Sequence, residues 1–261
     1  MNVLMIGDVV GKPGRRCLRA LLPELRRELA LDLVVANGEN AAAGFGLTEP
    51  TAQELFDAGV DVITSGNHIW DQKEILPVLD QETPVMRPLN YPEEAPGRGM
   101  ITQHGVTVIN LQGRTFMQAD IDSPFQAVDA ALATLPAGAV VVVDMHAEAT
   151  SEKQGMARYL DGRVAAVVGT HTHVPTADAR VLPGGTAYVT DLGMTGPQES
   201  IIGNEIEAVL QRFLTGLPAR LPVAEKSAIV QFNAVCIDID ESTARARSIV
   251  RVDREYRRDG E

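Results

Sequence analysis

The chain has 261 residues, with 35 acidic and 23 basic side chains, a formal net charge of −12, five histidines and two cysteines. A chain of this length can bury a hydrophobic core without stabilisation by disulfides or metal ions. Two cysteines cannot form a disulfide framework, which favours a reducing compartment, so we expect a cytoplasmic protein. The acidic excess argues against a long nucleic acid as partner, because such binding needs clustered Lys and Arg, but it leaves small phosphorylated substrates open.

The first third of the chain alternates apolar runs with helical patterns. Its predicted elements are a strand over 3–6, a helix over 17–29, a strand over 33–36, a helix beginning at 48–50 and a strand over 60–64. Pro23 is expected to kink or divide the first helix. Thr48 is the predicted N-cap of the second helix, with Pro50 in its first turn.

The remaining elements continue this alternation and then become richer in strands. They are a strand over 106–111, a helix over 124–135, a strand over 140–144, a helix capped by Thr150 or Ser151, a strand over 164–168, a hairpin of 179–182 with 187–190, a helix over 207–214 and strands over 229–239 and 244–252. Residues 253–261 are charged and expected to fray. With no repeat or linker, residues 1–261 are predicted to form a single α/β domain with more than one sheet.

Neither a membrane segment nor a signal peptide is expected. No apolar run approaches the about 20 residues that span a bilayer. The N-terminal sequence MNVLMIGD has no basic flank before its apolar run and no small-residue cleavage site.

Polar side chains follow five of the predicted strands directly. The eight candidates are Asp8, Glu39, Asn40, Asn67, His68, His146, His171 and His173. Loops beyond the carboxyl ends of strands in an open α/β sheet converge on one crevice, so these residues are expected to share a site. A single polar residue after a strand means little, because turns are rich in Asp and Asn. Repetition at five strand ends favours a functional cluster.

Carboxylates, amide oxygens and imidazoles suit divalent metals such as Mn, Fe or Zn, and the absence of thiolate argues against a structural zinc site. Eight donors exceed the needs of one ion but suffice for two if a carboxylate bridges them. Two-metal sites of this type stabilise the attacking and leaving oxygens of a displacement at phosphorus.

These motifs resemble those of the calcineurin-like metallophosphoesterases. The resemblance is carried by Gly7-Asp8, Gly38-Glu39-Asn40, Gly66-Asn67-His68, His146 and above all GTHTH at 169–173. The runs VANGENA at 35–41, SGNHIWD at 65–71 and TDLGMTG at 190–196 are more narrowly similar to the bacterial YmdB-type branch. The resemblance covers essentially the whole chain and implies a four-layer α/β/β/α sandwich, with two mixed sheets flanked by helices.

The resemblance also implies two metal ions, divalent or of mixed valence, with Fe or Mn expected and Zn or Mg as alternatives. One ion would take Asp8, Glu39, Asn40 and His173, and the other Glu39, Asn67, His146 and His171, so that Glu39 bridges. Two positions depart from the broad superfamily: Val10 stands where its first motif has histidine, and Glu39 stands where its second motif has aspartate. Asn40 can replace the missing imidazole, which makes the first site harder and weaker.

The implied mechanism is attack on phosphorus by a metal-bridging hydroxide, with His68 as general acid for the departing ribose oxygen. His68 directly follows a ligand, so its side chain can face the substrate. Asp71 would orient the imidazole if the chain turns helically there, and a solvated loop carboxylate is the equal alternative.

Five further residues are weaker candidates. Arg114 and Lys153 could contact substrate phosphate, although a surface position is the commoner case for both. Asp191 in a Gly-rich turn is interpreted as structural, and His104 as an exposed loop residue. Trp70 could stack on a nucleobase, but a core tryptophan is more common.

The sequence therefore predicts a phosphodiesterase acting on small phosphodiesters, most specifically 2′,3′-cyclic nucleoside monophosphates opened to 3′-phosphates. A phosphomonoesterase with the same metal centre is the nearest alternative, and a regulatory binding protein with little catalysis is the alternative of another class. The expected partner is the small phosphodiester or cyclic nucleotide; a homo-oligomer is left open.

Overall fold

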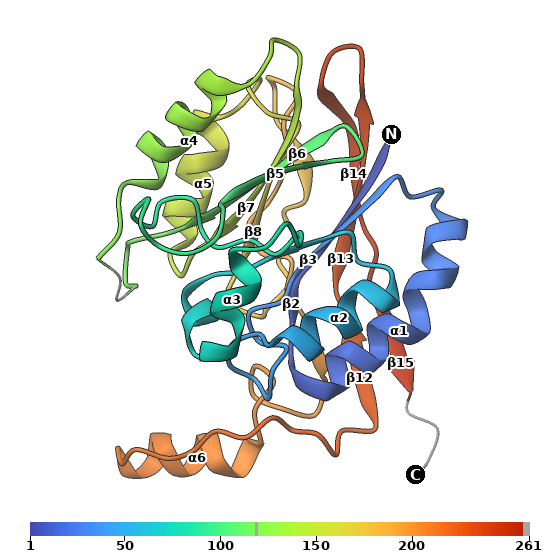
Figure 1. The fold of residues 1–261 in the computed structure, drawn as a ribbon. Coiled ribbons are helices and arrows are strands. Elements are labelled where there is room, and N and C mark those ends of the chain that lie inside the picture. The colour runs from blue at the N-terminus through green and yellow to red at the C-terminus, as the bar shows by residue number, and fades with distance from the viewer. Residues whose placement is uncertain (118–119, 258–261) are drawn as a thin grey trace.

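The computed structural model describes residues 1–117 and 120–257, whose strands form three hydrogen-bonded sheets with helices packed against them (Figure 1). This arrangement confirms the expected mixed α/β class. Among the described residues, no helix is both long enough and apolar enough to cross a membrane.

The first sheet contains the three N-terminal parallel strands and two antiparallel strands from the end of the chain. Its order is β14-β13-β1-β3-β4, with β1 at Asn2–Ile6, β3 at Leu33–Asn37, β4 at Val62–Thr64, β13 at Ala234–Asp240 and β14 at Arg245–Arg251. β1 runs parallel to β3 and antiparallel to β13. The first strand of the chain is thus paired with a strand from its last thirty residues.

The second sheet is formed by the middle of the chain. Its order is β5-β6-β7-β8-β10-β9, with β5 at Met100–Gln103, β6 at Val106–Gln112, β7 at Val140–His146, β8 at Ala166–Thr170, β9 at Arg180–Val181 and β10 at Ala187–Val189. β6, β7 and β8 are parallel, and β9 with β10 forms the predicted antiparallel hairpin. The parallel strands are fully buried, as their continuous apolar runs indicate.

The third sheet continues the first one beyond a break in the ladder. Its order is β15-β12-β11-β2, with β2 at Asp8–Val9, β11 at Met194–Pro197, β12 at Ile229–Phe232 and β15 at Arg254–Arg257. At the break, Gly7 N–H donates to the Asn233 carbonyl at 3.0 Å. A Cβ on Gly7 would lie 2.0 Å from the Gly193 carbonyl oxygen, so only glycine fits.

This third sheet corrects two expectations. The strand predicted over 229–239 is divided at Asn233, and residues 254–257, predicted to fray, pair with β12. The charged sequence of β15 gives no apolar signal because this strand is largely exposed. Residues 258–261 lie outside the described part of the chain.

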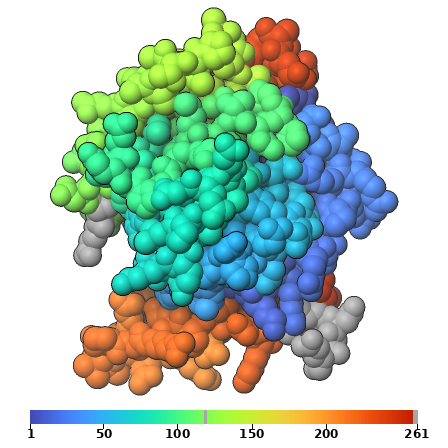
Figure 2. All heavy atoms as spheres, viewed as in Figure 1, coloured from blue at the N-terminus to red at the C-terminus, as the bar shows by residue number. Residues whose placement is uncertain are grey.

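The helices are α1 at Gly11–Glu28, α2 at Glu49–Ala58, α3 at Leu76–Leu79, α4 at Pro124–Thr134, α5 at Thr150–Tyr159 and α6 at Ile206–Thr215, with the short 3₁₀ segments η1 at Asn67–Trp70 and η2 at Lys73–Ile75. All the predicted helices are present, although α1 begins six residues before its predicted start and α3 was not predicted. Thr48 caps α2 as predicted. Pro23, however, lies inside a continuous α1, and α5 begins after Ala149 without a side-chain cap. The α6 region projects from the lower edge of the molecule (Figures 1 and 2).

Apolar side chains pack on both faces of the first two sheets. One cluster lies between these sheets and includes Met5 and Val35 from the first and Val108 and Val142 from the second. A second cluster packs the first sheet against α1 and α2, and a third packs the second sheet against α4 and α5. The carboxyl ends of the parallel strands in both sheets are thereby held beside each other.

Candidate metal centre

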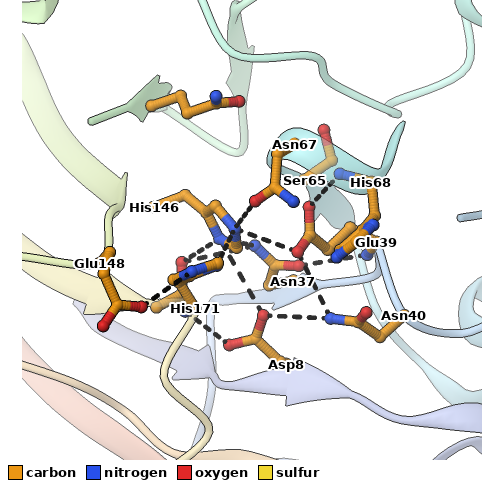
Figure 3. Close-up of polar contacts among 12 residues, drawn as sticks. Asp8, Asn37, Glu39, Asn40, Ser65, Asn67, His68, His146, Glu148 and His171 are labelled. Carbon is orange, nitrogen blue, oxygen red and sulfur yellow. Dashed lines mark hydrogen bonds and ion pairs between the residues drawn. The ribbon is translucent and has the colours of Figure 1, made fainter. Parts of the chain in front are cut away.

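The structure brings the sequence-predicted residues to one place, where the carboxyl ends of the two sheets meet; Figure 3 labels all of them except His173, which contacts Asn40 and Asp8. Asp8 opens β2, directly after β1 and Gly7, and Glu39 and Asn40 follow β3. Asn67 and His68 lie in η1, His146 ends β7, and His171 and His173 follow β8. Asp8, Glu39, Asn40 and His146 are at most 3% exposed. Four charged or strongly polar side chains are therefore buried together, which is costly unless they are paired or hold a cation.

Three ligand-type atoms surround the Nε2 atom of His146. Glu39 Oε1 lies 3.0 Å from this nitrogen, and Asn67 Oδ1 and His171 Nδ1 each lie 3.1 Å from it. The ligand-type atoms of Glu39, His146 and His171 lie within 4.8 Å of one another. Oxygen and imidazole lone pairs aimed at one point repel each other unless a proton or a metal ion lies between them. The donor set therefore fits a divalent cation.

A second group lies around the amide of Asn40. Its Nδ2 atom lies 3.3 Å from His173 Nε2, 3.4 Å from Glu39 Oε1 and 3.5 Å from Asp8 Oδ1. His173 Nε2 and Asp8 Oδ1 are 3.8 Å apart. Glu39 Oε1 contacts both groups and so occupies the position that a bridging carboxylate needs.

The electrostatics of these groups follow from burial and from one close ion pair. Burial alone would raise the pKa of Glu39, but the charge and hydrogen bond of His146 lower it to about 2. Burial alone would lower the pKa of His146, but Glu39 raises it to about 9. Burial raises the pKa of Asp8 to about 6, against the opposing charges of His173 and His146. Burial, followed by the charge of His146, lowers the pKa of His171 to about 3.

A buried polar network behind His146 was not predicted from the sequence. His146 Nδ1 lies 2.9 Å from Thr170 Oγ1, which donates to Asp144 Oδ1 at 2.7 Å. Thr64 Oγ1 donates to the other oxygen of Asp144 at 2.5 Å, and Asn37 Nδ2 lies 3.4 Å from that oxygen. Since the Thr170 proton is directed to Asp144, its oxygen accepts from His146 Nδ1–H. The network therefore directs His146 Nε2 toward the centre.

Backbone geometry at the site is tightly constrained. His171 and His173 have positive φ angles of 102° and 66°, which cost of order 1–3 kcal/mol each in a non-glycine residue. His171 N–H donates to Asp8 Oδ2 at 3.1 Å, and His173 Nδ1 lies 2.8 Å from the Ile202 carbonyl oxygen. A Cβ on Gly66 would lie 2.0 Å from the His146 ring, so the loop before Asn67 can approach this imidazole only through glycine.

His68 lies beside the two groups with its imidazole partly exposed. Its backbone N–H donates to Glu39 Oε2 at 3.0 Å, and its Nδ1 lies 2.8 Å from Asp71 Oδ2. The 3₁₀ turn of η1 brings Asp71 to this position, and the Asp71 side chain is exposed. The Phe45 ring packs edge-on against the imidazole with centroids 5.0 Å apart.

Glu148 is a further residue that the sequence did not single out. Its Oε2 atom lies 3.2 Å from His171 Nε2, and its side chain is half exposed. This contact leaves Nδ1 of His171 as the nitrogen that faces His146. No spacing in the sequence identifies Glu148, because its contact with His171 depends on how the imidazole is oriented in the folded chain.

The weaker candidates are placed as follows. Arg114 is exposed, and so is His104. Trp70 is partly buried and packs edge-on against Tyr91. Lys153 corrects the surface interpretation: it is 1% exposed, and its Nζ lies 2.6 Å from Asp191 Oδ2.

Comparison with known proteins relates the chain to one family over almost its whole length. A family model described as YmdB-like protein matches residues 4–252. A Bacillus subtilis protein named 2′,3′-cyclic-nucleotide 2′-phosphodiesterase is 47% identical over 257 residues, which are 97% of this chain and 96% of that protein.

Two solved structures are similar in both sequence and fold. A hypothetical protein from Thermus thermophilus has a TM-score of 0.91 at 46% identity, covering 98% of this chain and 99% of that one. A novel phosphatase from Mycoplasma pneumoniae has a TM-score of 0.91 at 32% identity, covering 98% and 93%. The residues matched by the family model, 4–252, include all eight candidate residues.

Proposed function

The chain belongs to the YmdB-like family, and we propose that it is a dinuclear metal-dependent phosphodiesterase that opens 2′,3′-cyclic nucleoside monophosphates to 3′-phosphates. The observation that carries the proposal is the convergence of Glu39, Asn67 and His171 on His146 Nε2 within 3.1 Å. The name of the Bacillus subtilis relative supports the choice of substrate.

Two sets of residues would hold the ions. Asp8, Glu39, Asn40 and His173 form one set, and Glu39, Asn67, His146 and His171 form the other. Fe or Mn suits these nitrogen and oxygen donors, with Zn or Mg as alternatives. When bound, the ions would supply Lewis-acid polarisation of the phosphoryl oxygens and a water of lowered pKa. The amide of Asn40 would present its oxygen after a half turn, since amide oxygen and nitrogen have nearly the same shape.

His68 is proposed as the general acid for the leaving oxygen. Water forms the new bond to phosphorus and loses a proton to the solvent, and the bond from phosphorus to the ribose 2′-oxygen breaks. That oxygen takes a proton from His68, which then regains one from the solvent. Asp71 accepts from Nδ1 at 2.8 Å and so leaves Nε2 as the nitrogen that delivers the proton. The backbone bond from His68 N–H to Glu39 Oε2 holds this imidazole beside the proposed ligands.

The proposal also includes the four-layer α/β/β/α arrangement of the metallophosphoesterases. The apolar cluster shared by the first two sheets supports it, together with the outer clusters against α1 and α2 and against α4 and α5. The third sheet extends the first one and adds no separate layer to this arrangement.

The function is tested by comparing substrates and variants side by side. Protein loaded with Mn²⁺ is given a 2′,3′-cyclic nucleotide, a 3′,5′-cyclic nucleotide and a simple phosphomonoester, and turnover of each is measured. We expect the 2′,3′-cyclic nucleotide to be hydrolysed fastest and its product to be the 3′-phosphate. Preference for the phosphomonoester would replace the proposal with a phosphomonoesterase, and failure on all three would favour a binding protein.

The acid is tested separately with His68→Ala and the matched control His104→Ala, which changes an exposed histidine outside the site. We expect His68→Ala to lower kcat by about 10²–10⁴-fold with unchanged metal content. His104→Ala should resemble the wild type. Loss of bound metal from His68→Ala would identify His68 as a ligand instead of an acid.

A further inference from the structure

The loop at residues 171–173 presents both candidate histidines from a backbone that needs external support. His171 and His173 each have a positive φ, a conformation that persists only where surrounding contacts fix it. The hydrogen bond from the His171 backbone N–H to Asp8 and the contact of the His173 imidazole with the Ile202 carbonyl support the two histidines themselves. Thr172, which lies between them, must be held by something else.

Asp191 holds Thr172 through two hydrogen bonds. Its Oδ2 atom accepts from the Thr172 backbone N–H at 3.2 Å and from the Thr172 hydroxyl at 2.8 Å. Asp191 Oδ1 accepts from Gly193 N–H at 2.8 Å, which fixes the carboxylate itself. Asp191 is 1% exposed, so water does not compete for these bonds.

Lys153 supplies the charge that a buried carboxylate requires. Its Nζ donates to Asp191 Oδ2 at 2.6 Å, and Lys153 is also 1% exposed. Thr172, Gly193 and Lys153 all act as hydrogen-bond donors here, and a carboxylate is an acceptor on both oxygens. An asparagine at this position would turn an NH₂ group toward one of the donors and leave the ammonium of Lys153 without a counter-charge.

The segment around Asp191 also contacts the strand that carries Asp8. Leu192 N–H donates to the Gly169 carbonyl at 2.8 Å, and Asp8 N–H donates to the Gly193 carbonyl at 3.1 Å. One short segment thereby links the end of β8 to the start of β2. This segment fixes the distance from Asp8 to His171 and His173.

We propose that Asp191, paired with the buried Lys153, is a positioning residue that holds the loop at residues 171–173 in its metal-binding conformation. Asp191 is not among the proposed metal ligands; it acts through Thr172. The inference rests on the proposed function, because it assumes that His171 and His173 are ligands. It assigns a role to the TDLGMTG segment, which the catalytic proposal leaves without one.

The test is the affinity of chelator-stripped protein for Mn²⁺ alone, measured by titration calorimetry below the unfolding temperature of every variant. We expect Asp191→Asn to weaken Mn²⁺ binding by about 10–100-fold, as loss of outer contacts to metal ligands typically does. The matched control is Asp178→Asn. Asp178 accepts from the hydroxyls of Thr176 and Thr190 on the adjoining loop and makes no hydrogen bond to residues 171–173. The Asp178→Asn variant should bind Mn²⁺ with the affinity of the wild type.

A milder variant decides the matter if Asp191→Asn does not fold. Thr172→Val removes one donor and leaves the Lys153–Asp191 pair intact, so we expect binding weaker by about threefold or more. Wild-type affinity in the folded Asp191 variant, or equal losses in the Asp191 and Asp178 variants, would overturn the inference. If Asp191→Asn does not fold, wild-type affinity in Thr172→Val overturns it. Absence of Mn²⁺ binding in the wild type would instead overturn the proposed function, and this inference with it.

Discussion

The Thr170 side chain links the candidate ligand His146 to the buried carboxylate of Asp144. Its oxygen accepts from His146 Nδ1–H, and its proton goes to Asp144. Burial raises the pKa of Asp144, and the hydroxyls of Thr64 and Thr170 act against that rise. The Thr170 hydroxyl is therefore the hydrogen-bond partner of both Asp144 Oδ1 and His146 Nδ1–H.

Replacing Thr170 with valine keeps the shape and removes this hydroxyl. We expect the free energy of unfolding to fall by about 1–3 kcal/mol, and metal affinity to fall by about 10–100-fold as His146 loses its orientation. Thermal unfolding and Mn²⁺ titration measure the two effects. Thr107→Val is the control, because it removes the hydroxyl bond to Thr102 in the second sheet outside the network. A Thr170 variant with unchanged affinity would show that the network does not orient His146.

The ion pair of Glu39 and His146 predicts how metal affinity depends on pH. Glu39 raises the pKa of His146 to about 9, so the metal-free imidazole carries a proton at neutral pH that a metal must displace. Affinity should therefore rise by about tenfold per pH unit between about pH 7 and 8.5. The stability of the metal-free protein changes with pH in the opposite direction. The stabilisation from the Glu39–His146 pair is complete below the unfolded-state histidine pKa of 6.5 and is lost as pH rises through about 9.

Mn²⁺ titrations at three pH values, in buffers of different ionisation enthalpy, report both the slope and the number of protons released. About one proton should leave near pH 7.5 for each metal bound by the set that contains His146. An affinity independent of pH, with no proton released, would mean that His146 is not a ligand.

The sequence predicted the residues that end strands but missed those that support them. Asp8, Glu39, Asn67 and His146 each follow an apolar run, and such runs can be recognised without a partner. Lys153 lies on an amphipathic helix and is typical of a surface residue there. Its burial depends on Asp191, 38 residues away in the chain, and no local pattern specifies such a pair.

At the scale of elements, α1 shows how packing overrides a local rule. Proline in the interior of a helix removes one hydrogen bond and crowds the preceding turn. Pro23 is exposed, while Leu18, Leu22 and Leu25 on the other face are buried against the first sheet. Burial of this apolar stripe keeps α1 continuous from Gly11 to Glu28.

Replacing Pro23 with alanine should therefore stabilise the protein. We expect the free energy of unfolding to rise by about 1–3 kcal/mol, because the missing N–H is restored and no buried group is changed. Pro50→Ala is the control, since Pro50 lies in the first turn of α2, where proline costs nothing. Denaturant unfolding compares the two. A Pro23 variant no more stable than the Pro50 variant would mean that α1 already accommodates the ring without strain.

The strands show what periodicity cannot reveal. Runs at 3–6, 106–111 and 140–144 were predicted within a few residues of their observed bounds. The break at Asn233 and the short strand β2 after Gly7 were not, because both depend on hydrogen bonds between segments far apart in the chain. Likewise β15 forms because β12 offers it an edge, and its own charged sequence predicts no strand.

At the scale of the whole molecule, the centre joins the two principal sheets. Asp8, Glu39 and Asn67 follow strands of the first sheet, and His146 and His171 end or follow strands of the second. The unfolded chain has no such arrangement, so a metal binds the folded state selectively.

Metal binding should therefore raise the melting temperature of the whole protein. At a free Mn²⁺ concentration of 100 times Kd, the stabilisation is about 2.7 kcal/mol, which corresponds to about 5–10 °C for a chain of this size. Thermal unfolding with and without Mn²⁺ measures the shift, and excess chelator should reverse it. Glu39→Ala should abolish it, because Glu39 belongs to both proposed sets. A shift retained in that variant would place the metal elsewhere.

The pairing of β1 with β13 has a consequence for the order in which the protein is made. All eight candidate residues have been added to the chain once residue 173 has been synthesised. Asp8 nevertheless lacks its neighbours until Met194–Pro197 arrives to form β11 and residues 233–240 arrive to bond Gly7 and β1. A nascent chain thus carries every ligand well before it can assemble the centre. Metal binding at the proposed centre therefore requires residues 194–240, which follow every candidate residue in the chain.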